Sequence, residues 1–346
     1  MLRAEWSPYR LNFNFEARTS RAVMRHKDTY LVRVWNDDAP EVYGLGECGL
    51  FAGLSAEDTP DYERRLDAAC RDMANGIGDD APSSVRMGLE TALADLGNGG
   101  VGRIYPDSEW LDGKTGIPIN GLVWMGDKAT MAERIKAKLE AGFKLLKIKI
   151  GGINFEEELE LLSLIRKHYS RDILELRLDA NGAFSPEEAT AKLERLSRFG
   201  IHSIEQPIKA GQYAEMARIC RNSPIPVALD EDLIGDTDVT FKRQMLEAVS
   251  PAYIILKPSL CGGFVGADSW IDEAEKLGIG WWATSALESN IGLNAIAQWV
   301  AAKRPKMAQG LGTGMLYTNN LPSQLRLEGP ELYFDPSAPR ASYPNT

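Results

Sequence analysis

One stretch of the sequence decides the fold: Lys144-Leu145-Leu146-Lys147-Ile148-Lys149-Ile150. Successive side chains of a β-strand point to opposite faces, so Lys147 and Lys149 share one face and the apolar residues share the other. If the apolar face packs on helices, both lysines point into the interior of a sheet or barrel. Charged side chains are rarely buried unless they are paired or bind a metal. An isolated Lys-x-Lys is usually a solvated edge strand, and the sequence downstream argues against that simpler interpretation.

Short apolar runs alternate with amphipathic segments from about residue 117 onward, which is typical of βαβ units in a parallel sheet. The predicted strands are 117–123, 145–150, 174–178, 204–205, 227–229, 253–256, 280–283 and, as the eighth, 309–312. Helical patterns between them include 128–141, 155–168, 186–199 and 266–277. Eight strands with crossover helices in roughly 200 residues predict an α/β fold of the (β/α)8 barrel type. The alternative, an open doubly wound sheet, needs a glycine-rich phosphate turn that Asn120-Gly121-Leu122-Val123-Trp124 does not provide.

A polar residue stands at the carboxyl end of each middle strand, at intervals of 25 to 30 residues. These residues are Lys149, Asp179, Glu205, Asp230 and Lys257. The interval is close to the length of one βα unit, so a barrel places all five around the mouth where active sites of this fold lie. A single acid after a strand is commonly a helix N-cap, but five polar residues in register are hard to obtain from capping alone. We therefore expect a catalytic constellation at this mouth.

Three of these residues predict a metal site. Asp179, Glu205 and Asp230 supply only oxygen ligands, which suits Mg²⁺, with Mn²⁺ able to substitute, and does not suit zinc. The chain has three histidines and none of them ends a predicted barrel strand, which argues against a zinc hydrolase. No serine is accompanied by a suitably placed histidine, so a hydrolase triad has no support either.

The lysines then face each other across the predicted metal. A lysine that acts as a base must lose its proton near neutral pH, and nearby cations and desolvation both lower a lysine pKa. Lowering that pKa from about 10.4 to about 7.5 requires roughly 4 kcal/mol of differential interaction. A proton taken next to a carboxylate leaves an enediolate dianion, which Mg²⁺ and a facing ammonium group can stabilise.

Composition bounds the class of protein. At 346 residues, with 44% hydrophobic and 25% charged residues, the chain is long enough for one large barrel or two globular domains. A net charge of −10 argues against nucleic acid as a partner, while local cations or a metal can still hold a small anionic carboxylate substrate. Four scattered cysteines, a polar N-terminus and the absence of any run near the ~18 apolar residues of a membrane span predict a cytoplasmic protein with no membrane partner. The oligomeric state is not indicated.

The N-terminal part is predicted to be an α+β capping domain. The expected domains are 1–112 for the cap, 113–319 for the barrel, and 320–346 as a C-terminal segment that joins the cap. Within the cap, strands are expected at 9–15 and 30–35 and helices at 57–74 and 83–96. A basic loop is expected over 17–28, with Arg18, Arg21, Arg25 and His26. Residues 44–49 are too glycine-rich for a helix and suggest a tight turn or a mobile loop, either a lid over the site or a plain turn.

The motifs at the strand ends resemble the muconate-lactonising-type branch of the enolase superfamily over about residues 118–314. They are Lys147-Ile148-Lys149, Asp179-Ala180-Asn181, Ile204-Glu205-Gln206-Pro207, Leu229-Asp230-Glu231 and Leu256-Lys257-Pro258. Within that branch the sequence is most similar to the o-succinylbenzoate synthases of menaquinone biosynthesis, which implies a modified TIM barrel with an α+β cap. The first hundred residues match the family's capping domain more loosely.

The resemblance implies a role for each residue of the site. Asp179, Glu205 and Asp230 would bind Mg²⁺. Lys149 would take the α-proton of a cyclohexadiene carboxylate and then assist loss of the hydroxyl group on the same face, so that an aromatic ring results. Lys257 would stabilise the enediolate from the opposite face, and Lys147 would support Lys149.

The resemblance also implies substrate contacts at Ser285, Ser289 and Gly263. The turn 285–292 resembles the family's carboxylate-binding turn, whose backbone N–H groups open a helix toward an anion. An ordinary serine cap predicts nearly the same residues. Trp124 is the better candidate for an apolar wall of the site, while Trp281 and Trp282 are expected in the barrel core.

Several other reactions remain open. Epimerases and racemases of the superfamily share the metal and lysine set. Dipeptide epimerases typically carry Asp-x-Asp after the eighth strand, and residues 310–320 contain no carboxylate, whereas N-acylamino acid racemisation needs no such site. A Schiff-base aldolase using Lys257 would not need three carboxylates, and a binding protein that kept only the fold would be expected to lack a ligand or a lysine. Neither of these last two is favoured.

Overall fold

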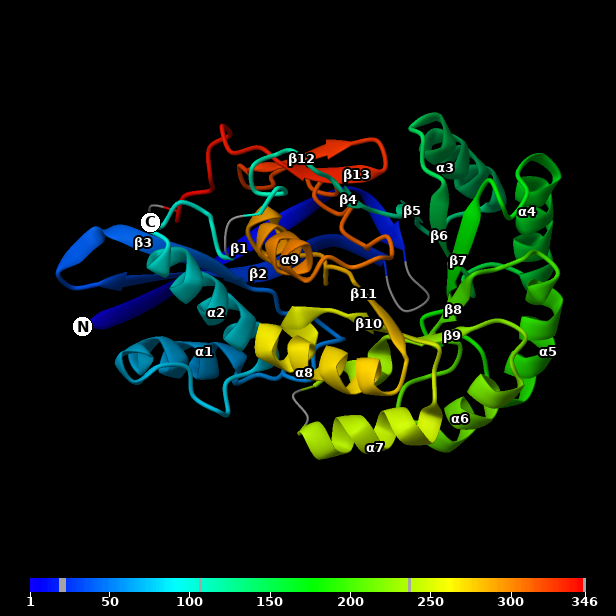
Figure 1. The fold of residues 1–346 in the computed structure, drawn as a ribbon, viewed down its shortest axis with the longest axis horizontal. Coiled ribbons are helices and arrows are strands. Elements are labelled where there is room, and N and C mark those ends of the chain that lie inside the picture. The colour runs from blue at the N-terminus through cyan, green and yellow to red at the C-terminus, as the bar shows by residue number, and fades with distance from the viewer. Residues whose placement is uncertain (19–22, 106–107, 236–237, 345–346) are drawn as a thin grey trace.

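The computed structural model describes residues 1–18, 23–105, 108–235 and 238–344. Seven parallel strands form a curled sheet in the order β11-β10-β9-β8-β7-β6-β5, so each strand pairs with its neighbour in the sequence (Figure 1). They are β5 (Gly121–Val123), β6 (Leu145–Lys149), β7 (Glu175–Asp179), β8 (Ser203–Glu205), β9 (Val227–Leu229), β10 (Tyr253–Leu256) and β11 (Gly280–Ala283). This sheet confirms the predicted α/β barrel architecture.

A helix follows each of these strands, and α3 to α7 form an arc outside the strands (Figure 1). The helices are α3 (Lys128–Glu140), α4 (Phe155–His168), α5 (Pro186–Ser197), α6 (Tyr213–Asn222), α7 (Val239–Val249), α8 (Gly263–Lys276) and α9 (Asn290–Lys303). Short 3-10 turns precede α7 and α8: η2 (Glu231–Leu233) and η3 (Pro258–Leu260). Local sequence explains where these helices begin: at α5, Ser185 and Glu188 form a capping box and Pro186 takes the first helical position. Among the described residues, no helix is both long and apolar enough to cross a membrane.

The predicted eighth strand is reduced to two isolated bridges. Gln309 pairs with Ile119 beside β5, and Gly310 pairs with Thr284 beside β11, both in parallel. These residues therefore close the curled sheet into a barrel. The absence of a side chain at Gly310 permits this close approach, since a Cβ atom there would lie 2.4 Å from Thr284 Oγ1.

The predicted strand 117–123 is divided at its proline. Residues of β4 (Ile117–Pro118) leave the barrel and pair with β13 (Glu331–Phe334), which also pairs with β12 (Leu325–Glu328). Pro118 has no backbone N–H, which suits the edge of this small sheet better than a central barrel strand. The hairpin β12–β13 was not predicted.

The N-terminal part is a three-stranded antiparallel sheet, β1 (Leu2–Arg18), β2 (Val23–Asn36) and β3 (Ala39–Cys48), packed with helices α1 (Tyr62–Arg71) and α2 (Ser83–Gly97) (Figure 1). A 3-10 turn, η1 (Met73–Asn75), follows α1. The two strands and the helix at 83–96 are confirmed. The helix expected from residue 57 begins only at Tyr62, because Pro60 disfavours helical backbone at Thr59.

The expected basic loop is wrong for the described part of 17–28. Arg18 ends β1, and Arg25 and His26 lie in β2, where both are exposed. From His26 onward exposed and buried residues alternate, with Lys27 and Thr29 buried and Asp28 exposed, which is the two-sided pattern of a strand. Arg21 lies outside the described residues.

The glycine-rich segment 44–49 is also not a turn, since residues 44–48 belong to β3. A Cβ atom at Gly44 would lie 1.8 Å from Ala92 O, and one at Gly46 would lie 1.9 Å from Gly88 O. Two glycines therefore allow β3 to pack directly on the backbone of α2. A mobile lid at 44–48 is ruled out by this packing.

The C-terminal segment runs back to the N-terminal sheet. Arg340 Nη1 lies 3.1 Å from Asp95 Oδ2, and the Tyr343 backbone N–H donates to Tyr43 Oη at 3.3 Å. These contacts agree with a C-terminal segment that joins the cap, and the domain boundaries themselves stay a prediction.

Candidate active site

Strand β6 presents its two lysines to the barrel interior. Leu146 and Ile148, on the other face, belong to the large core cluster under the helices. Lys147 and Lys149 are only 9% and 8% exposed. The register of the strands places the acids next to the lysines, because Lys149 is opposite Asp179 and Asp179 is opposite Glu205.

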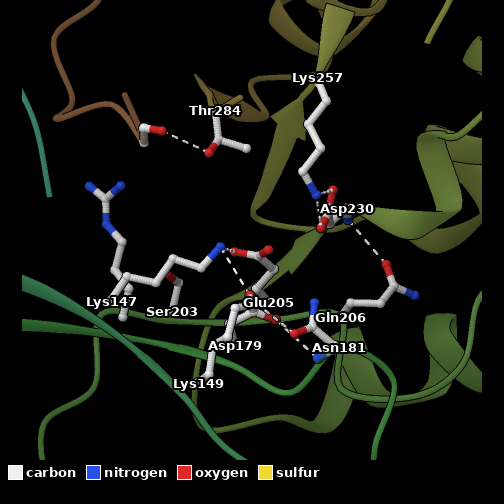
Figure 2. A network of polar contacts seen from close by, with 12 residues as sticks. Lys147, Lys149, Asp179, Asn181, Ser203, Glu205, Gln206, Asp230, Lys257 and Thr284 are labelled. Carbon is white, nitrogen blue, oxygen red and sulfur yellow. Dashed lines mark hydrogen bonds and ion pairs between the residues drawn. The ribbon is translucent and has the colours of Figure 1, made fainter. Parts of the chain in front are cut away.

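These side chains form one polar network at the mouth of the barrel (Figure 2). Lys147 Nζ lies 2.5 Å from Glu205 Oε2 and 3.1 Å from Asp179 Oδ2. Lys149 Nζ donates to Asp179 Oδ2 at 2.8 Å and to Asn181 Oδ1 at 2.7 Å. The predicted interior position of both lysines is therefore what the structure shows.

Lys257, directly after the end of β10, also belongs to the network. Its Nζ donates to Asp230 Oδ1 at 2.5 Å and also contacts Oδ2. Figure 2 shows Lys257 reaching Asp230 apart from Lys147 and Lys149, which lie together at the other side of the acids. The five predicted strand-end residues and Lys147 are thus brought together, with lysines on two sides of three carboxylates.

The electrostatics of the acids follow from burial and neighbouring charge. Burial raises the pKa of Asp179, but the adjacent Lys147 and Lys149 outweigh it and hold that pKa below its usual value. Burial and repulsion from Asp179 raise the pKa of Glu205 well above its usual value, despite attraction to Lys147. Glu205 is therefore the acid of this pair that most needs a further positive charge.

Two of the ammonium groups are stabilised in their charged form. Burial lowers the pKa of Lys147, but attraction to Asp179 and Glu205 is stronger and the net pKa is raised. Burial also lowers the pKa of Lys257, and attraction to Asp230 again leaves it raised. As charged ammonium groups, the two lysines are suited to stabilising negative charge.

The three carboxylates fit a hard divalent cation. All their donors are oxygen atoms, and Glu205 Oε1 is buried without a hydrogen-bond partner among the described residues. In the described parts of the chain, no three acidic, histidine or cysteine side chains already enclose a space for an ion, and the lysine ammonium groups contact the acids. A buried carboxylate with an unused oxygen is the feature that fits a metal ligand.

A cavity of about 280 Å³ lies over this network. The N-terminal part supplies Met24, Phe51, Ala52, Gly53 and Leu54 to its lining. The barrel supplies apolar groups at Leu122, Trp124, Trp282 and Leu287, and polar groups at Asn120, Thr284, Ser285 and Thr313. Among the described residues of the lining, Asp179 and Glu205 are the only carboxylates.

The residues predicted to contact substrate are placed differently. Ser285 lines the cavity, with its hydroxyl 2.6 Å from that of Thr313. Ser289 instead caps α9, where its hydroxyl accepts from the Ile291 N–H at 3.2 Å. Gly263 begins α8 and packs against Glu90. Ser285 alone of the three is therefore among the residues that line the cavity.

Sequence reasoning missed Asn120, which stands at the edge of the cavity. Its Oδ1 is buried and has no hydrogen-bond partner among the described residues, and the same holds for Trp124 Nε1. Asn120 and Trp124 flank β5 and line the cavity together with Leu122 of this strand. Alternation by two residues back from Trp124 could therefore have predicted Asn120. Trp281 is buried in the core as expected, whereas Trp282 also reaches the cavity.

The chain is similar to known proteins in both sequence and fold. A family described as enolase C-terminal domain-like matches residues 130–332. The o-succinylbenzoate synthase of Desulfotalea psychrophila (strain LSv54 / DSM 12343) is 46% identical over 356 residues, which cover 92% of this chain and 95% of that protein.

Solved structures agree with this match. The crystal structure of MenC from Desulfotalea psychrophila LSv54 superposes with a TM-score of 0.81 and 42% identity, covering 96% of this chain and 99% of that chain. A dipeptide epimerase from Enterococcus faecalis V583, complexed with Mg and the dipeptide L-Leu-L-Tyr, has a TM-score of 0.83 at 19% identity and covers 98% of both chains. At that identity the epimerase supports the fold alone.

Proposed function

The chain belongs to the o-succinylbenzoate synthase family of the enolase superfamily, and from this premise we propose its reaction, its metal and the role of each site residue. The reaction is the syn elimination of water from 2-succinyl-6-hydroxy-2,4-cyclohexadiene-1-carboxylate, which gives o-succinylbenzoate. The observation that supports it most is the network of three lysines and three carboxylates under one cavity.

We propose that Asp179, Glu205 and Asp230 hold Mg²⁺, with Mn²⁺ able to substitute. When bound, the ion supplies a Lewis acid that stabilises negative charge on a substrate carboxylate. The support from this chain is the oxygen-only donor set and the unpartnered Glu205 Oε1.

Lys149 is the proposed base and acid. In the neutral form its Nζ takes the proton from the carbon that bears the carboxylate, and the electron pair of the broken C–H bond forms the enediolate. The resulting ammonium group then gives that proton to the leaving hydroxyl on the same face, so the C–O bond breaks and water departs. Proton and hydroxyl leave as one water molecule, and no other acid is needed.

Lys257 and Lys147 act as charged groups in this proposal. Lys257 stabilises the enediolate from its own side of the acids, which agrees with a raised pKa that keeps it protonated. Lys147, between Asp179 and Glu205, supports the position and charge of Lys149. Aromatisation favours the product, so these residues need only lower the barrier to the enediolate.

The cavity suits a small carboxylate with an apolar ring. Trp124, Leu122 and Phe51 offer apolar walls, while Ser285 and Asn120 offer polar contacts to the carboxylate groups. We propose that Ser289 and Gly263 act on substrate binding through the turns that they hold, since neither lines the cavity. The described lining has no carboxylate besides Asp179 and Glu205 to receive the ammonium group of a dipeptide.

Racemisation of N-acylamino acids is the remaining alternative, because lysines stand on two sides of the carboxylates and such substrates carry no free ammonium group. It requires Lys149 and Lys257 each to transfer a proton, whereas syn dehydration requires proton transfer by Lys149 only. Exchange of the α-proton of an N-succinylamino acid in heavy water distinguishes the two, since a dehydratase is expected to exchange it slowly and a racemase rapidly.

We propose further that the enzyme works in the cytoplasm and supplies o-succinylbenzoate to menaquinone biosynthesis. Expression in a bacterium that needs menaquinone and lacks its own synthase tests this role. The wild-type chain should restore growth and Lys149→Ala should not. Growth that depends on added o-succinylbenzoate, despite expression of the folded wild-type chain, would contradict the proposal.

A further inference from the structure

Next to the cavity wall lies a buried group of charged and hydroxyl side chains that the proposed reaction does not use. We call it the cap–barrel cluster, and all its members are at most 6% exposed: Lys27, Glu47, Ser259, Glu288 and Ser289. Two carboxylates and an ammonium group are costly to bury, so their role requires an explanation.

Glu47 fastens the cap strand β3 to the start of α9. Its Oε1 accepts hydrogen bonds from Thr29 Oγ1 at 2.8 Å and from the Ser289 backbone N–H at 2.9 Å. Its Oε2 accepts from the Ser289 hydroxyl at 2.5 Å and from the Gly292 N–H at 3.0 Å. A carboxylate at a helix N-terminus that accepts four hydrogen bonds is a strong and directional link.

Glu288 contacts the turn that contains Ser259 and packs beside glycines of the cap and of α9. Its Oε1 accepts a hydrogen bond from the hydroxyl of Ser259, two residues after the catalytic-site Lys257. A Cβ atom at Gly49 would lie 2.9 Å from Glu288 Cγ, and one at Gly292 would lie 2.7 Å from it, so glycines of the cap and of α9 leave room for this side chain. Burial raises the pKa of Glu288 more than attraction to Lys27 of β2 lowers it.

Both links adjoin walls of the cavity. Glu288 directly follows the lining residues 285–287, of which Leu287 has the unusual backbone angle φ 61°. Glu47 stands shortly before the lining residues 51–54 of the cap. The cluster therefore connects the turn on the barrel side of the cavity with the loop on the cap side.

We propose that Glu47 and Glu288 are positioning residues that hold these two walls at a fixed separation and thereby set the affinity for substrate. The proposal rests on the proposed function for the identity of the substrate. Neither residue lines the cavity, and the lysines and carboxylates of the network lie in the barrel strands or directly after them. A change in the separation of the walls should therefore weaken substrate binding more than it slows the chemical step.

The test compares Glu47→Gln and Glu288→Gln, which keep the side-chain shape, with Glu41→Gln, an exposed residue of the same strand as Glu47. We expect both buried variants to raise KM for the cyclohexadiene by about tenfold or more while kcat stays within about threefold. Glu41→Gln should change neither. A purely structural role would instead lower the fraction of active protein, so kcat would fall at constant KM, and that result would overturn the proposal.

Hydrogen exchange of the ligand-free protein makes the test independent of the assigned reaction. Glu288→Gln should speed amide exchange in residues 50–56 of the cap as well as in 284–292, and Glu41→Gln should do neither. If exchange changes as expected but the wild-type chain does not dehydrate the cyclohexadiene, the proposed function fails and the positioning role stands. Unchanged exchange in 50–56 overturns the positioning role, and Ser259→Ala carries the same test if a glutamate variant does not fold.

Discussion

Lys149 and Asp179 face each other across neighbouring parallel strands, with Lys149 Nζ 2.8 Å from Asp179 Oδ2. The proposed base and a proposed metal ligand are thus register partners, one residue from each of two consecutive βα units. The same register extends to Glu205. A barrel built this way brings acids and bases that are far apart in the sequence within hydrogen-bonding distance without any loop rearrangement.

Metal removal should abolish activity. Asp179→Asn should lower Mg²⁺ affinity and turnover together while the barrel stays folded, because one ligand loses its charge and the core is untouched. Calorimetric titration with Mg²⁺ and activity after chelation measure the two effects. Asp172→Asn, an exposed residue shortly before β7, is the matched control and should behave as wild type. Full activity in the chelated, metal-free protein would rule out the metal role.

The lysines should differ in their importance. Lys149→Ala and Lys257→Ala should each lower kcat by about a thousandfold or more, because proton transfer and enediolate stabilisation are separate requirements. Lys147→Ala should be less severe, since its proposed role is electrostatic support. Lys144→Ala, exposed just before the same strand, should leave kcat unchanged. Near-native turnover in Lys149→Ala would show that the base is misassigned.

The packing of β3 on α2 predicts a stability difference between two glycines. Gly46→Ala places a Cβ atom 1.9 Å from Gly88 O, so we expect a loss of about 3 kcal/mol in the free energy of unfolding. Gly97→Ala, at the exposed end of α2 with nothing within 4 Å, should change stability by less than about 1 kcal/mol. Urea unfolding of both variants measures the difference. Equal stabilities would contradict the close approach of strand and helix.

The pH dependence of stability should carry a contribution from Glu90. Burial raises its pKa to about 7, although a hydrogen bond from the Phe264 N–H at 2.7 Å lowers it. The folded state therefore holds this proton more tightly than the unfolded state, so the contribution is fully present below the ordinary carboxyl pKa. It is lost as pH rises through about 7.

Glu90→Gln removes this titration. Relative to wild type, the variant should gain stability as pH rises from 5 to 8, most steeply below pH 7, because Glu90 loses its proton around a pKa of about 7. Unfolding free energies at these pH values measure the effect, with Glu194→Gln, exposed on α5, as the control. A wild-type-to-variant difference that is the same at pH 5 and pH 8 would contradict the assignment.

Most of the barrel could be predicted because its strands are short apolar runs that end in polar residues at regular intervals. The eighth strand could not be predicted correctly, since its apolar run does not reveal that only Gln309 and Gly310 pair with the neighbouring strands. The glycines at 44 and 46 suggested a turn because their actual reason, contact with the backbone of α2, is a tertiary feature. In the basic segment, a register shift between Asn12 and Ala17 interrupts the strand pattern that would have indicated a hairpin.

Some residues of the candidate site could also be predicted from the sequence, and others could not. Its lysines and acids were predictable because register along parallel strands converts sequence spacing into proximity. Asn120 could not be predicted in the same way, because only the packing of neighbouring side chains shows that it lines a cavity. Glu47 and Glu288 come from different parts of the chain. No periodic sequence pattern indicates that both are buried next to the start of α9.

The proposed reaction is tested most directly by offering both substrates to the Mg²⁺-loaded protein in heavy water and following them by proton NMR. We expect rapid appearance of o-succinylbenzoate from the cyclohexadiene, with slow α-proton exchange of an N-succinylamino acid. It also predicts that Lys149→Ala loses product formation. Negligible dehydration beside rapid α-proton exchange would contradict the synthase assignment in favour of a racemase, while leaving the fold and the network of lysines and carboxylates in place.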